Sequence, residues 1–140
     1  MTLPADDTST ATATAQRPPA RIEGPSAWTG PDIGAHPERW CLQLQADDLH
    51  ELDAAIRTVQ ASGLALADIT PATFALPRLS GTLSRLLDQL LEGCGFALVR
   101  GFPVERYTLE QTAIAYLGIG AHLGSFRSQN AKGHLLGHVT

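Results

Sequence analysis

The chain has 140 residues, 44% of them hydrophobic, and this length suits one folded domain. Its formal net charge is −4, and acidic and basic residues are interspersed, so no basic stripe indicates nucleic acid as a partner. The sequence has neither an apolar run of about 18 residues nor an apolar secretory segment. We therefore expect a cytoplasmic protein that does not span a membrane, with Cys41 and Cys94 as free thiols.

The amino-terminal stretch, residues 1–24, is dominated by Thr, Ala and Pro and has almost no large apolar side chain. Such a stretch cannot offset its ordering entropy by burial, and we expect it to be a disordered tail. The folded domain is then predicted to cover residues 25–140. It opens with GPSAWTGPDIG, a loop expected to lie on the rest of the domain with Trp28 as its anchor.

Two amphipathic helices are predicted next. The first begins near Asp48, which is spaced from Glu51 as in a capping box, and it stops at Gly63. A short helical turn follows, with Thr70 as its cap, and a second helix in LSGTLSRLLDQLLEG ends at a glycine. The predicted apolar faces consist of Leu49, Leu52, Ile56 and Val59 in the first helix, and Leu79, Leu83, Leu86, Leu87 and Leu90 in the second.

A buried strand is predicted at residues 96–100, between glycines. A third helix follows, with Thr108 as its cap and Gln111 completing a capping box. Its inner face is predicted to consist of Leu109, Ala113, Tyr116 and Leu117.

Only one other segment, residues 135–139, has the pattern of a strand. A lone buried strand leaves backbone donors and acceptors unpaired, and a two-stranded sheet is marginal by itself. We therefore expect the fold to need strands that this sequence does not contain.

Three short patterns could mark chemical sites, but each has a simpler interpretation. The glycines of GIGAHLG close a helix, whereas a dinucleotide-binding loop opens one. His134 and His138 on a strand would lie about 13 Å apart, too far for one metal ion. His36 and Glu38 match the His-x-carboxylate pattern of non-haem iron sites, but Pro37 between them indicates a solvated loop.

The segment SQNAKG is the remaining candidate site. Amide groups beside a single cation suit the binding of a polar or anionic small molecule, and a polar surface loop is the simpler alternative. The sequence indicates no catalytic residue and no metal ligand. The candidate substrate-binding residues are Ser128, Gln129, Asn130 and Lys132.

Several segments, in their order and spacing, resemble the amino-terminal part of TauD/TfdA-family dioxygenases. They are GPSAWTG, GLALADIT with FALPRL, GCGFALVRGFPVERYT and, most specifically, GAHLGSFRSQNAKGHLLGHV. The resemblance covers roughly residues 24–139. It implies an iron(II)- and 2-oxoglutarate-dependent enzyme related to taurine dioxygenase and gamma-butyrobetaine hydroxylase. Such an enzyme decarboxylates 2-oxoglutarate with oxygen, and the resulting ferryl species abstracts hydrogen from a small organic substrate.

The resemblance also implies an α+β fold, a double-stranded β-helix (jelly-roll) with flanking helices, of which this chain would hold the helices and first strands. In the family, the His-x-Asp/Glu motif, the later histidine and the 2-oxoglutarate-binding arginine follow the segment that resembles SQNAKGHLLGHV. None of them maps onto this chain, whereas the four candidate residues map onto a region that borders the substrate pocket. We therefore expect a dioxygenase fragment that is inactive alone, binds no iron or 2-oxoglutarate, and needs a downstream polypeptide. The alternative is a non-catalytic helical interaction module derived from the family.

Overall fold

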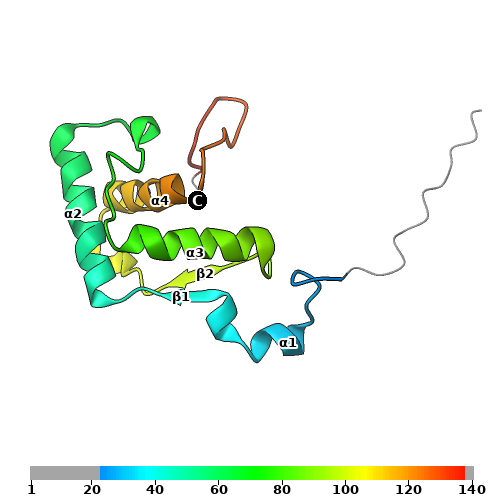
Figure 1. Cartoon of the computed structure of the whole chain (residues 1–140). Helices are drawn as coiled ribbons and strands as arrows, with labels where there is room; N and C mark the ends of the chain where they lie inside the picture. The colour runs from blue at the N-terminus through cyan, green and yellow to red at the C-terminus, as the bar shows by residue number, and fades with distance from the viewer. Residues whose placement is uncertain (1–22, 138–140) are drawn as a thin grey trace, which may run out of the picture.

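The computed structural model describes residues 23–137, in which three long helices pack together beside two short parallel strands (Figure 1). The predicted tail, apart from its last two residues, lies outside this range and stays a prediction. The long helices are α2 Ala46–Ser62, α3 Leu79–Glu92 and α4 Leu109–Leu123, and the strands are β1 Cys41–Gln43 and β2 Leu98–Arg100. The shorter elements are α1 Gly30–Gly34 and the 3₁₀ turns η1 Pro37–Arg39, η2 Leu66–Asp68 and η3 Val104–Arg106.

Helix α2 begins three residues earlier than the sequence predicts, with Gln45 and not Asp48 as its cap. The carboxylate of Asp48 accepts a hydrogen bond from the backbone N–H of Gln45 at 2.8 Å, so Asp48 is the third helical residue and not the cap. The helix ends as predicted at Gly63, whose φ of 65° is the left-handed conformation that glycine adopts without a steric penalty.

Glu51 has a different role from the predicted one in the capping box of its own helix. Its two carboxylate oxygens accept hydrogen bonds from the backbone N–H groups of Arg78 and Leu79, at 2.7 and 2.9 Å. These donors lie at the start of α3, where backbone N–H groups have no partner within the helix. A side chain of α2 therefore caps α3.

Helix α4 begins with the predicted capping box. Thr108 accepts from the N–H of Gln111 at 3.2 Å, and the Gln111 side chain accepts from the N–H of Thr108 at 3.0 Å. This reciprocal pair satisfies two donors that the first turn of the helix leaves unpaired.

The predicted inner face of α4 is half wrong. Ala113 and Leu117 are buried, but the side chains of Leu109 and Tyr116 are 73% and 66% exposed. The buried face instead includes small residues, and at Gly118 the ring of Phe74 takes the space that a Cβ atom would fill. The close approach of the α4 backbone to the ring of Phe74 therefore decides which side of α4 faces inward.

The β2 strand has a partner that the sequence analysis missed. Strand β1 pairs with it in parallel, in a register that sets Cys41 opposite Leu98 and Gln43 opposite Arg100. The sequence predicts residues 135–139 as the possible second strand, whereas β1 is the partner observed, and the described sheet has only two strands. Helices and a small parallel sheet agree with the predicted α+β class.

One hydrophobic core holds these elements together, and it includes side chains from the connection between α2 and α3. Burial of this set is the main stabilising contribution to the fold. The most deeply buried large side chains are Leu52, Ile56 and Val59 in α2, Leu79 and Leu83 in α3, Leu117 in α4, and Phe74 and Leu76 in the connection.

The loop before α1 is anchored as predicted. Trp28 donates its indole N–H to the carbonyl of Cys94 at 2.8 Å, and its ring lies 5.0 Å from that of Phe96. Cys94 is buried where α3 turns toward β2, and both cysteines are free. No helix among residues 23–137 is long and apolar enough to cross a membrane.

The strand predicted at residues 135–139 is not observed where the structure describes this segment. Leu135 and Leu136 lie in a bend that folds back over α4, and residues 138–140 lie outside the described range.

Candidate functional site

The polar segment after α4 forms a compact loop that is held by its own side chains. The Asn130 side-chain oxygen accepts from the N–H groups of Lys132 and His134, at 3.0 and 3.2 Å. The N–H of Gln129 donates to the carbonyl of His134 at 2.7 Å, closing the loop. Gly133 has a φ of 81°, which a side chain at this turn would disfavour.

The four candidate substrate-binding residues all lie exposed in this loop. Ser128 donates to the carbonyl of Asn130 at 2.7 Å, and the Gln129 amide donates to the carbonyl of Arg127 at 3.0 Å. Most of their polar atoms therefore shape the loop. Among the four candidate residues, and within the described chain, Lys132 is the one whose side chain makes no hydrogen bond or ion pair. Its ammonium group is therefore available to an external anion.

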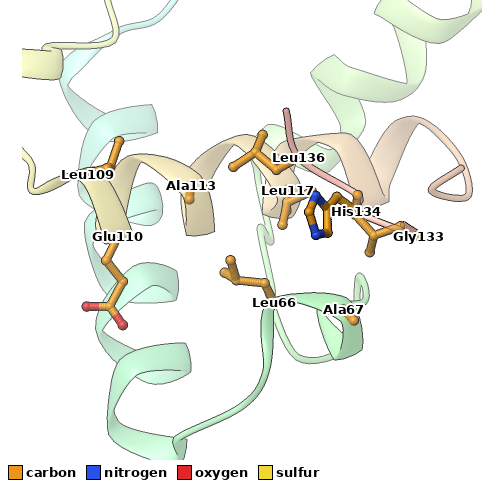
Figure 2. Close-up of a pocket in the computed structure, with 10 residues that line it drawn as sticks. Leu66, Ala67, Leu109, Glu110, Ala113, Leu117, Gly133, His134 and Leu136 are labelled. Carbon is orange, nitrogen blue, oxygen red and sulfur yellow. The ribbon is translucent and has the colours of Figure 1, made fainter. Parts of the chain in front are cut away.

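An apolar groove of about 770 Å³ is lined by this loop, by η2 and by α4 (Figure 2). Leu66 rises from η2 on one side, Leu117 lies on α4, and His134 and Leu136 come from the loop. Glu110 lies at one end, and its carboxylate accepts a long hydrogen bond, 3.5 Å, from Gln60. With almost no polar lining, this groove suits apolar groups and offers little to fix a polar substrate.

A second groove is also lined by residues of this loop and is more polar than the first. It measures about 610 Å³ and includes Gln129 from the candidate set, together with Tyr116 of α4 and Arg127. A guanidinium, an amide and a hydroxyl around one groove can bind a carboxylate or a similar anion. The sequence analysis missed Arg127 and Tyr116, although Arg127 adjoins the candidate segment.

The residues considered for a metal site do not come together. His36 and Glu38 hydrogen-bond to each other at 3.1 Å, and both side chains are more than half exposed. The pKa of Glu38 is lowered, first by its own backbone N–H and then by His36. His134 contacts Asn130, and His138 lies outside the described residues. Among residues 23–137, no three His, Cys, Asp or Glu side chains gather as a metal would require.

The glycines of GIGAHLG lie in the last turns of α4 and just after it, as the sequence analysis expected. His122 in this stretch is structural, because its Nε2 lies 2.8 Å from the carbonyl oxygen of Phe74. Helix α4 therefore ends here against the connection between α2 and α3.

The chain matches no known protein-family profile. It is similar to the taurine hydroxylase-like protein SAT17 of Stachybotrys chartarum, with 30% identity over 120 residues, 85% of this chain and 31% of that protein. It is also similar to FR-33289 synthase of Streptomyces rubellomurinus, with 26% identity over 112 residues, 80% of this chain and 33% of that protein. The chain thus spans about a third of the length of these curated relatives, and these matches confirm the predicted resemblance to the amino-terminal part of TauD/TfdA-like oxygenases.

Proposed function

We propose that this chain is the amino-terminal portion of an iron(II)- and 2-oxoglutarate-dependent dioxygenase that oxidises a small organic molecule. The observation that carries the proposal is the 30% identity with a taurine hydroxylase-like protein over most of this chain but under a third of that protein. Two free thiols are typical of a reducing compartment, which supports a cytoplasmic location.

The donor groups of residues 23–137 do not fit the iron centre that the family implies. A 2-His-1-carboxylate site needs three converging ligands, whereas the one His-x-carboxylate pair here is exposed and hydrogen-bonded internally. The iron ligands and the 2-oxoglutarate site are therefore proposed to belong to a portion that corresponds to the two thirds of the relatives' length outside the match. The same portion would complete the jelly-roll, to which β1 and β2 would contribute the first strands.

The contribution of this chain to catalysis is proposed to be on the substrate side. The polar groove beside the loop offers Arg127 and Gln129, and the free ammonium group of Lys132 lies on the same loop. These groups would bind and orient a substrate with an anionic or strongly polar end. Ser128 and Asn130 would act indirectly, because their side chains hold the loop in shape.

The first experiment measures succinate formation by the purified chain with iron(II), 2-oxoglutarate and oxygen. We expect no succinate above a protein-free control, because the described residues supply no iron site. The matched control is the double variant His36→Ala, Glu38→Ala. Turnover that the wild-type chain sustains and the double variant loses would make this pair an iron ligand and contradict the proposal.

The enzymatic part is tested in a chimera in which this chain replaces the matched segment of SAT17, assayed beside SAT17 itself. We expect the chimera to form succinate where the chain alone does not. Lys132→Ala and Arg127→Ala should then raise the KM for the organic substrate and leave the KM for 2-oxoglutarate unchanged. A chimera that folds and consumes no 2-oxoglutarate under conditions where SAT17 does would count against the assignment.

A second candidate function is a non-catalytic interaction module. One observation favours it, namely that α2, α3 and α4 already enclose a core with several fully buried side chains. Such a module would be monomeric and resistant to proteolysis by itself. Limited proteolysis combined with sedimentation velocity distinguishes it from a fragment, which would be cleaved or would associate.

A further inference from the structure

The two edges of the small sheet are not equivalent. In a parallel pair, alternate residues direct their backbone groups to the same neighbour. The N–H of Leu98 donates to the carbonyl of Trp40 at 2.8 Å, and the carbonyl of Arg100 accepts from Leu44 at 2.9 Å. These residues of β2 therefore face β1. The N–H and C=O of Val99, between them, face the opposite edge, where the described chain has no third strand.

The outer edge of β1 is partly closed by a side chain. The carbonyl of Gln43 points away from β2, and it accepts a hydrogen bond from the side-chain amide of Gln45 at 3.0 Å. Such a cap hinders the approach of another strand. The outer edge of β2 carries no comparable bond among the described residues, so it is the open edge of the sheet.

The sheet also has one covered face and one uncovered face. Leu42 and Val99, which are opposite each other in the register, pack against the core. The neighbouring pair, Cys41 and Leu98, lies on the other face, and Leu98 is 39% exposed. Parallel sheets occur almost only with both faces covered, and an open edge beside an exposed apolar side chain is a strand-pairing site.

We infer that the outer edge of β2, with the exposed side of Leu98, is the docking site for a β-strand from the rest of the full-length protein. This inference rests on the proposed function, because the relatives extend over about three times the matched length. A strand is favoured as occupant because the site offers an unpaired backbone N–H and C=O beside an apolar side chain. The groove on α4 offers apolar contact alone.

The first test uses the 140-residue chain by itself. An open pairing edge accepts strands from other copies, so the wild-type chain should associate as its concentration rises in sedimentation velocity. Leu98→Lys places a charge at the edge, and Val99→Pro removes the outward N–H while leaving the β1 ladder intact. Both variants should stay monomeric. The matched control is Leu109→Lys, at an exposed position at the start of α4. This variant should associate like wild type.

Two results would overturn the inference. One is a wild-type chain that is monomeric at every concentration. The other is association that persists in both edge variants while their circular dichroism shows a native fold. Because Leu98 is already partly exposed, Leu98→Lys keeps the test informative if Val99→Pro fails to fold.

The second test identifies the occupant by thiol alkylation. Cys41 lies on the uncovered face opposite Leu98, whereas Cys94 is 4% exposed and serves as the internal reference. In the SAT17 chimera, Cys41 should react several-fold more slowly than in a dilute, monomeric sample of the isolated chain. Unchanged Cys41 reactivity in a folded chimera would reject this occupant without affecting the enzymatic assignment, which the succinate assay tests separately.

Discussion

The contact between Gly118 and Phe74 gives a stability prediction that can be worked from the structure. A Cβ atom at residue 118 would lie 2.4 Å from two carbons of the Phe74 ring, whereas carbon atoms in contact prefer about 3.5–4.0 Å. Phe74 is fully buried, so its ring has to move by about 1 Å or more within a packed core. Overpacking of this kind typically costs about 1–3 kcal/mol.

The matched control is Gly81 in α3, where an added Cβ atom would meet nothing within 4 Å. Gly81→Ala should stabilise the fold by up to about 1 kcal/mol, because alanine is the better helix former. Gly118→Ala gains the same propensity, and after about 1 kcal/mol is subtracted for this gain it should be less stable than wild type by up to about 2 kcal/mol.

Urea denaturation followed by far-UV circular dichroism, at concentrations where the chain is monomeric, measures the free energy of unfolding of wild type and both variants. The two substitutions are chemically identical, so their difference isolates the packing against Phe74. A Gly118→Ala variant as stable as Gly81→Ala would refute the close approach of α4 to the connection between α2 and α3.

Two further predictions concern single side chains. Burial of Tyr107, and then its hydrogen bond to Asp53, raise the pKa of its phenol to about 12. The neutral phenol therefore stabilises the fold below pH 10. This contribution to the free energy of unfolding is lost as the pH rises through 12. Ultraviolet titration should show a late tyrosinate step that Tyr107→Phe removes, and a single step near pH 10 for wild type would contradict this. Glu51→Ala should lower the free energy of unfolding by about 1 kcal/mol, because it removes both acceptors that cap α3. Glu92→Ala, exposed at the far end of α3, is the control and should unfold like wild type in urea.

The amino-acid sequence by itself determined the three long helices and most of their ends. Gly63 stops α2 and the Thr108–Gln111 box starts α4 because these signals act within a few residues of chain. The relationship to oxygenases was also readable, since it depends on the order of segments and not on their packing.

Long-range contacts decided what the sequence left open. Strand β1 has three residues and no periodic pattern, so only its pairing with β2, more than fifty residues away, makes it a strand. Glu51 caps α3 instead of its own helix because the fold brings the two helix starts together. The inward side of α4 is set by the fit of Phe74 against Gly118, and it leaves Leu109 and Tyr116 exposed. Hydrophobic periodicity records which residues are apolar, whereas the tertiary structure decides which of them find a partner, because burial depends on shape as well as polarity.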